Sequence, residues 1–447
     1  MKLTKHIIPV DIGSDGFLII NSLNGLIDKV DKAVFNVICK WRDIGNIVPD
    51  ISENSFEEDL YNLLKLRGYL INNDEEEACM KETIVSALRD KHLAGTDVFN
   101  HITFILTYNC NFRCPYCYEE ENTAKKEVIT PEQIDAAIFL AGTNLKSVGL
   151  FGGEPLLPST RKSIEYLVSV IADIPITITT NGYHLLEYSD LLSSLNILSV
   201  HVTLDGEESN HDKRRFLADG SPTFQRIMCG IERCLELSIP IRIRMNIDSS
   251  IFDSGVALRS NLIEKFSSYS HLLSFEFGSM LDSMNDEKSN LFLKLYESDK
   301  DKDHASRLNR NLSAGRFNPI VNTFTIGIGL KPVYSYCYAH SNSSIIVDPY
   351  GNMYSCLVAA GKQQLSIGTY YPKFELNKIG IHTRNIESII ECNNCEYSLL
   401  CGGGCPLKLP SYDDVLKPEC NTIRNQIHNV LPQVYRINRK AKTINCS

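Results

Sequence analysis

Three cysteines within eight residues constrain this chain more than any other feature of its sequence. Cys110, Cys114 and Cys117 follow one another with the spacing C-x3-C-x2-C. Cysteine thiolates are the usual ligands of a four-iron cubane, which needs four of them. Three thiolates placed this closely can hold three irons and leave the fourth iron open. The apolar run 101–107 precedes them, and we interpret it as a buried strand that delivers the thiols to its carboxyl end.

Zinc is the main alternative for clustered cysteines. Structural zinc sites are usually built from C-x2-C pairs, and the x3-then-x2 spacing fits that pattern poorly. An open iron can instead chelate the amino and carboxylate groups of S-adenosylmethionine (SAM) and donate an electron to its sulfonium, which releases a 5′-deoxyadenosyl radical. In such chemistry the cofactors carry the reaction and the protein orients them.

The cysteine loop resembles the signature of the radical SAM superfamily. Tyr116 sits where that family often places a residue against the adenine. The segment Gly152-Gly153-Glu154-Pro155 resembles the one that binds the amino group of the cofactor. Glycines let the backbone approach a ligand closely, and a carboxylate complements an ammonium group. The resemblance therefore implies that Tyr116, Gly152, Gly153 and Glu154 contact the cofactor.

Strands and helices alternate between about residues 97 and 320, which is typical of a parallel sheet. We predict strands at 101–107, 147–151, 176–180, 199–204, 240–246 and 273–277. Six strands agree with the partial (β/α)6 TIM-like barrel of the superfamily, whose site lies at the carboxyl ends of the strands. By resemblance, Thr203 lies near the ribose, Asp205 supports the site and Asn246 is a further candidate contact. We predict no catalytic residue beyond the cluster ligands, and His211 receives no catalytic role.

A second set of seven cysteines lies towards the C-terminus. Its spacing resembles the SPASM extension of radical SAM enzymes, which binds two auxiliary [4Fe-4S] clusters. The resemblance assigns to auxiliary cluster I Cys337, Cys356 and Cys405, and to auxiliary cluster II Cys392, Cys395, Cys401 and Cys420. Two zinc sites are the alternative, because the pair 392 and 395 has the spacing of a zinc knuckle. The predicted cofactors are three [4Fe-4S] clusters and SAM.

Auxiliary cluster I lacks an obvious fourth protein ligand. Sulfatase-maturing relatives carry an additional Cys shortly before the first of the seven, whereas residues 331–336 contain none. Cys446 at the tail could reach back. Otherwise a substrate Cys could bind the iron and be coupled to a peptide carbon as a thioether. Those relatives also place a proton-accepting Asp where this chain has Leu357, which disfavours sulfatase maturation.

Residues 1–95 are predicted to form a separate winged-helix-like α+β unit. A strand-like run at 16–21, helical patterns at 32–41 and 56–66, and a short strand after Gly68 support it. Its 11 Lys and Arg against 16 Asp and Glu argue against DNA binding. The layout resembles the recognition element of enzymes that modify ribosomally made peptides, where a leader peptide adds a strand to the wing. We interpret the charged stretch 74–77 and the helical stretch 82–93 as a solvated linker.

Three domains are thus expected: 1–95 for peptide recognition, 96–325 for the radical SAM barrel and 326–447 for the SPASM extension. With 43% hydrophobic and 22% charged residues, the composition is that of a globular protein. There is no signal peptide and no apolar run of spanning length, so we expect a cytoplasmic protein without a membrane partner. In that reducing compartment the fifteen cysteines favour metal over disulfides. The net charge of −9 disfavours nucleic acid.

The sequence therefore predicts a radical SAM oxidoreductase. It would abstract hydrogen from a ribosomally made precursor peptide, bound through its leader, and form an intramolecular cross-link, with a Cys thioether preferred. A reducing electron donor is a further expected partner. The alternative is a SPASM oxidoreductase that forms a carbon–carbon cross-link or modifies a protein or small molecule. A non-catalytic electron carrier or zinc-bearing interaction module is a third possibility, which iron analysis would separate from the enzymes.

Overall fold

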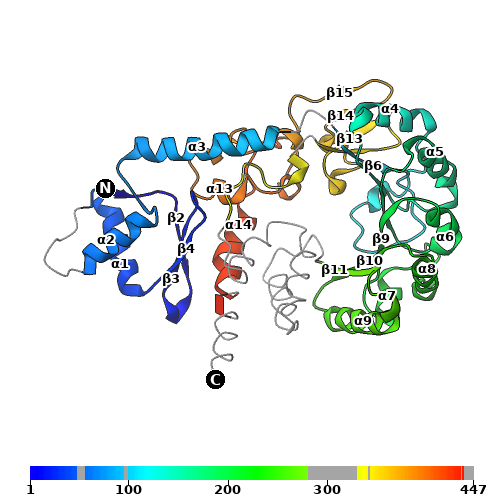
Figure 1. Ribbon diagram of the computed structural model, residues 1–447, viewed down its shortest axis with the longest axis horizontal. Helices are drawn as coiled ribbons and strands as arrows, with labels where there is room; N and C mark the ends of the chain where they lie inside the picture. The colour runs from blue at the N-terminus through cyan, green and yellow to red at the C-terminus, as the bar shows by residue number, and fades with distance from the viewer. Residues whose placement is uncertain (48–55, 95–98, 280–329, 341–342, 434, 437–447) are drawn as a thin grey trace.

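A computed structural model describes residues 1–447 apart from 48–55, 95–98, 280–329, 341–342, 434 and 437–447. The predicted fold class is confirmed: a partial parallel barrel is combined with a small N-terminal α+β region and a cysteine-rich C-terminal region (Figure 1). The barrel and the N-terminal region lie at opposite ends of the molecule, and the long helix α3 runs between them. No helix of the described residues combines the length and apolarity needed to cross a bilayer.

The N-terminal region contains two small antiparallel sheets and three helices. Strands β2, β3 and β4 form one sheet, and β1 pairs with β5. One side of the larger sheet packs against the helices through Ile19, Ile38 and Leu60. Its other side packs through Ile8 on Ile427 of the C-terminal region. The elements are β1 Lys2–Leu3, β2 Ile7–Asp11, β3 Phe17–Asn21, β4 Ile27–Val30, α1 Lys32–Ile44, α2 Phe56–Leu66, β5 Leu70–Ile71 and α3 Asp74–Leu93.

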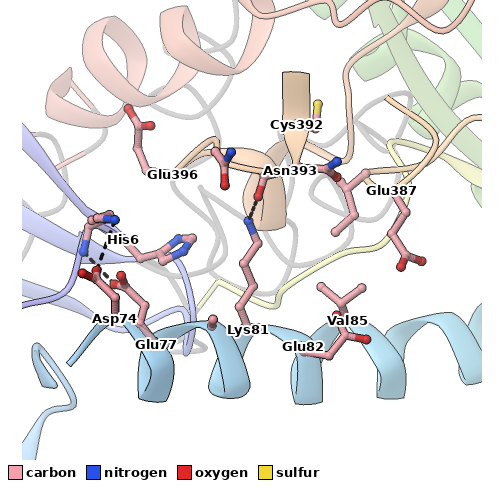
Figure 2. A pocket seen from close by; sticks show the side chains of 14 residues that line it. His6, Asp74, Glu77, Lys81, Glu82, Val85, Glu387, Cys392, Asn393 and Glu396 are labelled. Atoms are coloured by element: carbon pink, nitrogen blue, oxygen red, sulfur yellow. Dashed lines mark hydrogen bonds and ion pairs between the residues drawn. The ribbon is translucent and has the colours of Figure 1, made fainter. Parts of the chain in front are cut away.

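Helix α3 is not the solvated linker that its charges suggest. It is one helix of 20 residues, which begins at the N-cap Asn73, whose side chain accepts a hydrogen bond from the Glu76 amide. Glu77 is buried and accepts hydrogen bonds from the Thr4 hydroxyl and the Lys5 amide. Val85 packs in a buried cluster with residues of the C-terminal region (Figure 2). A narrow buried stripe on a charged helix was too sparse to show in the sequence.

The barrel is built from six parallel strands in the order β11-β10-β9-β8-β7-β6. Its strands are β6 His101–Ile105, β7 Ser147–Phe151, β8 Ile176–Thr180, β9 Ile197–Thr203, β10 Ile241–Ile247 and β11 Leu273–Ser279. Its helices are α4 Pro131–Ala141, α5 Arg161–Ile171, α6 Leu185–Ser193, α7 Glu208–Arg214, α8 Phe224–Glu236 and α9 Phe252–Lys265. Local chemistry sets the ends: Thr130 and Gln133 form a capping box before α4, with Pro131 at its first turn.

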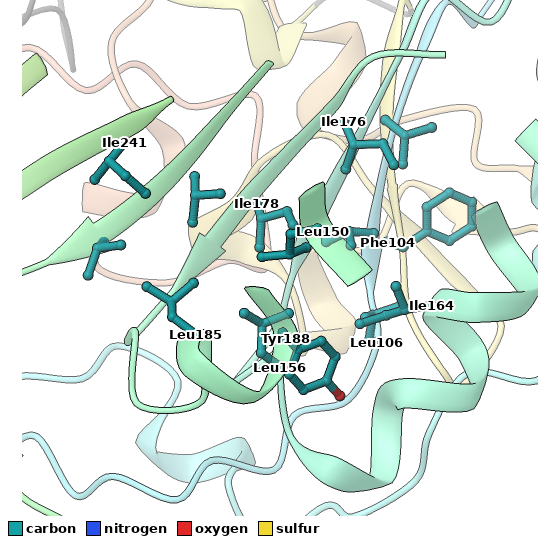
Figure 3. Close-up of a cluster of buried hydrophobic side chains, with 14 of the residues drawn as sticks. Phe104, Leu106, Leu150, Leu156, Ile164, Ile176, Ile178, Leu185, Tyr188 and Ile241 are labelled. Atoms are coloured by element: carbon teal, nitrogen blue, oxygen red, sulfur yellow. The ribbon is translucent and has the colours of Figure 1, made fainter. Parts of the chain in front are cut away.

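The main core lies between the outer face of the barrel strands and these helices. Ile178 and Ile241 of the strands belong to this core together with Leu185 and Tyr188 of α6 (Figure 3). Because strand side chains alternate, the residues that alternate with these core positions face the inside of the barrel. Of the two cysteines of α8, Cys234 is buried and Cys229 is exposed. Five residues along a helix turn the side chain through about 140°, which puts the two on different faces.

The C-terminal region continues the barrel sheet, which the sequence did not reveal. Strand β12 (Ser344–Val347) pairs in parallel with β6 and forms a hairpin with β13 (Asn352–Tyr354). In the turn of this hairpin, Asp348 accepts hydrogen bonds from the amides of Tyr350 and Asn352. Strands β14 (Gly368–Thr369) and β15 (Glu375–Leu376) complete ten strands. The short helices α13 (Ser398–Cys401) and α14 (Asn421–Asn425) follow.

Candidate functional site

The cysteine loop begins directly after the carboxyl end of β6. Its own groups fold it: the Phe112 amide donates to Cys110 Sγ at 3.4 Å, and the Cys117 amide donates to the Cys114 carbonyl at 3.1 Å. The Phe112 side chain is buried in the main core and anchors the loop. The charges of the three thiols interact with one another. The structure thus brings the three predicted ligands together at the end of the barrel.

Burial is what controls the protonation of these thiols. It raises the pKa of Cys110 to about 12, with the charge of Glu154 as the next cause. It also raises the pKa of Cys114 and of Cys117. Thiolates that are costly alone in such surroundings become favourable when bound to cations, since metal ligation deprotonates Cys. The loop therefore suits an iron–sulfur cluster, which supplies those cations.

Zinc requires four ligands around one ion, with each sulfur about 2.3 Å from it. Among the described residues, no group of three or more His, Cys, Asp and Glu side chains could hold a single metal ion. The preference for clusters over zinc therefore stays a prediction from the cysteine spacing.

Gly152 and Gly153 pack against the chain that leads into the cysteine loop. A Cβ on Gly153 would lie 2.2 Å from the Tyr108 carbonyl oxygen, and one on Gly152 would lie 2.2 Å from that of Thr107. Gly152 also has a φ of +137°, which side chains rarely allow. We expected these glycines to make room for a ligand. In the structure, the groups they admit are backbone carbonyls of residues 107–109.

Glu154 is fully buried and bound on both oxygens. Its Oε1 accepts hydrogen bonds from the Leu156 amide at 2.9 Å and the Thr180 hydroxyl at 2.6 Å, and its Oε2 accepts one from the Asn181 amide at 2.7 Å. Asn181 Nδ2 in turn lies 3.9 Å from Cys110 Sγ. Glu154 thus ties the end of β8 to the cysteine loop. Burial raises its pKa, and these three donors act in the opposite direction.

Tyr116 and Asp205 form the centre of a polar network beside the loop. The Tyr116 hydroxyl donates to Asp205 and accepts a hydrogen bond from Arg215 Nη1 at 2.8 Å. Asp205 is fully buried, and its Oδ1 accepts a hydrogen bond from the Asn246 amide at 3.1 Å. The guanidinium of Arg214 stacks over the Tyr116 ring at 5.1 Å. Three of the predicted cofactor contacts are therefore connected.

Two predicted positions stand at the margin of this network. Thr203 ends β9, is 8% exposed and pairs in register with Arg244 of β10. His211 is buried, where its Nδ1 accepts a hydrogen bond from the Asp205 amide and its Nε2 lies 3.1 Å from the Thr223 hydroxyl. His211 therefore supports the loop that carries Asp205.

Sequence reasoning missed three polar residues that complete the site. Arg214 and Arg215 follow the HDK segment, and only their basic character was noted. Asn181 belongs to a segment that we had noted only as a strand end. For Asn181 a better signal would have been its position just after a parallel strand, because such strand ends converge on one edge. Arg214 and Arg215 lie at the end of α7, where no comparable signal exists.

The structure also gathers the C-terminal cysteines into two sets. Cys337 and Cys356 pack against the same apolar cluster, and Cys356 interacts electrostatically with Cys405. The second set is connected by charge: Cys392 interacts with Cys395 and Cys420, and Cys401 with Cys392 and Cys420. Burial raises the pKa of Cys392 to about 11 and that of Cys401 to about 12. The resemblance assigns these same residues to auxiliary clusters I and II, and that assignment stays a prediction.

A buried arginine holds the loop that joins these sets. Arg384 is 0% exposed and donates hydrogen bonds to the carbonyls of Gly403 at 2.6 Å, Gly404 at 3.4 Å and Val415. A Cβ on Gly404 would lie 2.0 Å from the Glu419 carbonyl oxygen, so that position requires glycine. The charge of Arg384 also interacts with Cys392, Cys405 and Cys401 in that order.

A cavity of about 630 Å³ separates helix α3 from the second cysteine set (Figure 2). Cys392 lies on its wall, and His6 lines it from the N-terminal region. Lys81 Nζ donates across it to the Asn393 carbonyl at 2.5 Å. The cavity is formed by the N-terminal and C-terminal regions and lies away from the barrel site.

Comparisons with known proteins agree with this construction. Residues 104–248 match the Radical SAM superfamily. A probable GTP 3′,8-cyclase of Archaeoglobus fulgidus is 30% identical over 165 residues, which cover 36% of this chain and 53% of that protein. A GTP 3′,8-cyclase of Campylobacter curvus is 28% identical over 154 residues, 33% of this chain and 46% of that protein. The chain therefore spans about half the length of these curated relatives.

Two solved structures share the fold over a larger part of the chain. Native anSMEcpe with bound AdoMet is 17% identical with a TM-score of 0.54, and the match covers 76% of this chain and 99% of that one. Streptococcus suis SuiB bound to S-adenosylmethionine is 16% identical with a TM-score of 0.53, covering 94% and 99%.

The barrel and its cysteine loop contain residues 104–248, which match the Radical SAM superfamily, so this part of the chain is a radical SAM domain. The fold of the chain is that of the anSMEcpe and SuiB structures, with a cysteine-rich C-terminal region. A radical SAM domain implies one [4Fe-4S] cluster and SAM at the barrel.

Proposed function

We propose that this chain is a radical SAM maturase that cross-links a ribosomally made precursor peptide, with a Cys thioether as the preferred product. The fold similarity to SuiB covers 94% of the chain, including the N-terminal region. One SuiB structure is titled as bound to the precursor peptide SuiA, and one anSMEcpe structure as bound to AdoMet and the Cp18Cys peptide. The GTP 3′,8-cyclase relatives match only about a third of the chain, so they support the barrel chemistry alone.

The proposed cofactors are three [4Fe-4S] clusters and SAM. Cys110, Cys114 and Cys117 would hold the barrel cluster, and the two C-terminal sets would hold auxiliary clusters I and II. Tyr116, Gly152, Gly153, Glu154, Thr203, Asp205 and Asn246 are the proposed residues around SAM. Glu154, Gly152 and Gly153 would act by holding the strand ends around SAM in place, because the groups that they contact in the structure belong to the protein itself.

The single observation that favours a thioether is the incomplete ligand set of auxiliary cluster I. Cys337, Cys356 and Cys405 lie near one another, and residues 331–336, where a fourth Cys would stand, contain none. Cys446 lies outside the described residues. We infer that a substrate thiolate occupies the fourth position, which would hold it beside the barrel and make the coupling effectively intramolecular.

The reaction balances in atoms and electrons. When bound, the cluster and SAM would supply the radical chemistry that removes one hydrogen atom from a peptide carbon. The substrate sulfur would bond to that carbon with release of its thiol proton, and clusters held by the C-terminal cysteines would supply an acceptor for the remaining electron. The contribution of the protein is to hold both partners in place. Pairing of β12 with β6 supports this role, because it joins the two cysteine regions through one sheet.

The N-terminal region is the proposed leader-binding element. Strands β2 and β4 are the edges of a three-stranded sheet whose two faces are covered. An extended peptide can add to such an edge through backbone hydrogen bonds. A reducing donor and a cytoplasmic location complete the proposal.

Co-expression with a short Cys-containing precursor peptide tests the function, and the first place to look for such a precursor is an open reading frame next to that of this chain. We expect a product that has lost two hydrogens and one alkylatable thiol by mass spectrometry. A precursor with every Cys changed to Ser should stay unmodified. A cross-linked product from that Cys-free precursor would contradict the thioether and favour a carbon–carbon bond. Release of 5′-deoxyadenosine without the peptide separates radical chemistry from substrate choice.

A further inference from the structure

The inner face of the barrel is positively charged on one side. Ile241, Ile243 and Met245 of β10 are fully buried against the helices, so Arg242 and Arg244 between them point into the barrel. Figure 3 shows Ile241 on the helix-facing side of its strand. The same alternation turns His201 of β9 inwards, because Val200 and Val202 are buried in the core.

The strand register brings these inward residues side by side. Arg242 pairs with His201 of β9 and with Ser274 of β11, while Arg244 pairs with Thr203 and Glu276. Residues in register on neighbouring strands share a face of the sheet. Burial, followed by the charges of Arg242 and Arg244, lowers the pKa of His201 to about 4. His201 is therefore neutral at physiological pH, and the positive charge in this part of the barrel comes from the two arginines.

Only one of the two guanidinium groups is neutralised. Arg244 Nη1 lies 3.2 Å from Glu276 Oε1, and its Nε donates to Asn246 Oδ1 at 3.1 Å. Arg242 forms no ion pair with a carboxylate of the described residues, and its buried Nε has no hydrogen-bond partner among them. A buried donor without a partner is costly unless a ligand satisfies it. Two cations thus face one carboxylate inside a protein whose net charge is −9.

The pair lies next to the candidate cofactor residues but deeper in the barrel. Asn246, whose amide donates to Asp205, stands two residues above Arg244 and four above Arg242 along β10. Gly278 of β11 keeps the space open, since a Cβ there would lie 2.8 Å from Arg244 Nη2. Across the sheet, Ile105 of β6 and Phe151 of β7 pack in an apolar cluster. A ligand lying across the barrel would therefore meet an apolar side and a cationic side.

We propose that Arg242 and Arg244 bind a carboxylate of the peptide substrate, and so select an acidic residue beside the carbon that reacts. Guanidinium groups bind carboxylates through paired, charge-assisted hydrogen bonds, which a partly desolvated site strengthens. The carboxylate comes from an Asp or Glu side chain or from the C-terminus of the peptide. This inference rests on the proposed peptide substrate and defines its chemistry further.

Calorimetric titration of the reconstituted enzyme with SAM bound tests this without requiring any reaction. The probes are acetyl-Ala-Glu-Ala-amide, acetyl-Ala-Gln-Ala-amide and acetyl-Ala-Gln-Ala with a free C-terminus. We expect at least one of the two carboxylate probes to bind about tenfold more tightly than the neutral probe at low salt. The probe that binds more tightly identifies the source of the carboxylate. Arg242→Met should reduce this difference in affinity below about twofold, and Arg242→Lys should retain part of it.

Arg233→Met is the matched control, because that arginine lies on the outer helix α8 and pairs with Asp190 and Glu236 at the surface. It should keep the full preference for carboxylate. Equal binding of all three probes to the native enzyme would overturn the proposal, and so would an unchanged preference in Arg242→Met. If Arg242→Met lost affinity for SAM and not for the probes, the arginine pair would be assigned to the cofactor, which would also overturn the proposal. These binding measurements require no reaction, so they stay valid even if the co-expression experiment yields no thioether.

Discussion

The two cysteine regions of this protein are constructed in different ways. In the barrel, three thiols lie on one loop of eight residues, directly after β6 and between strands in register. In the C-terminal region, seven thiols come from separate turns and short helices, and one buried arginine holds the loop between them. The comparison teaches that contiguous ligands need one well-supported strand end, whereas dispersed ligands need the packing of a whole region.

We expect the largest effect from Cys110→Ala. This substitution tests whether the barrel and the C-terminal region bind their iron independently of each other. We expect cofactor cleavage to be abolished, and about four of roughly twelve irons per chain to be lost, because one cubane loses a ligand. Iron analysis and chromatography of 5′-deoxyadenosine measure both. The exposed Cys229→Ala should change neither. Loss of all iron from Cys110→Ala would show that the regions are not independent.

Arg384→Leu is the counterpart in the C-terminal region. It removes the guanidinium donor from the carbonyls of Gly403, Gly404 and Val415, which should cost about 3–5 kcal/mol of local stability. Iron should be lost from the C-terminal sets while the barrel cluster still cleaves SAM. Iron content and thermal unfolding provide the measurements. Arg89→Leu, which removes a surface ion pair with Glu387, should leave both almost unchanged. Equal effects of the two variants would contradict the importance of the buried arginine.

Two glycine substitutions sharpen the comparison at the level of the backbone. Gly153→Ala would bring a Cβ to 2.2 Å from the Tyr108 carbonyl oxygen, and Gly404→Ala would bring one to 2.0 Å from that of Glu419. Each should cost about 1–3 kcal/mol, the first with weaker SAM binding and the second with less iron in the C-terminal sets. Gly220→Ala is the control for backbone strain alone: its φ of +85° disfavours a side chain, but no atom lies within 4 Å of the added Cβ, so SAM binding and iron content should not change. Loss of C-terminal iron from Gly153→Ala, or weaker SAM binding in Gly404→Ala, would refute the idea that the two cysteine regions are supported separately.

Acid should weaken the barrel through His211. Burial, followed by the charge of Arg215, lowers the pKa of this imidazole to about 3, from 6.5 when it is exposed. The unfolded chain therefore binds a proton below pH 6.5 that the folded chain does not, so stability falls as the pH decreases from 6.5 to about 3. The slope is about 1.4 kcal/mol per pH unit, or roughly 2 kcal/mol between pH 6.5 and 5.

Urea unfolding of His211→Gln at pH 7.5 and pH 5 measures this contribution. The variant should be less stable than the native chain at pH 7.5, because it perturbs the hydrogen bonds to Asp205 and Thr223. It should lose less stability on acidification. His271→Gln, at an exposed position, should follow the native chain. Parallel pH dependence of the native chain and His211→Gln would exclude this residue as the source.

Much of the fold could be predicted from the sequence. Strands β7 and β8 occur at the predicted residues, because short apolar or β-branched runs between helical patterns leave few alternatives. The hairpin turn at Asp348 also has a local cause, since Asp, Pro, Gly and Asn together favour one. Helix α3 was misread and the pairing of β12 with β6 was missed, because contacts between distant segments leave no periodic signal.

By itself, the sequence determined the chemistry of this protein: thiols spaced for clusters, glycines before a carboxylate, and alternating strands and helices. Those features depend on neighbours in the chain, which are visible in any linear reading. Only the tertiary structure decided the partners: Glu154 with Asn181, Tyr116 with Asp205, and Arg242 beside Arg244 without a carboxylate of its own. The physical reason is that burial and strand register bring together groups far apart in sequence, and their environment decides which charges are satisfied.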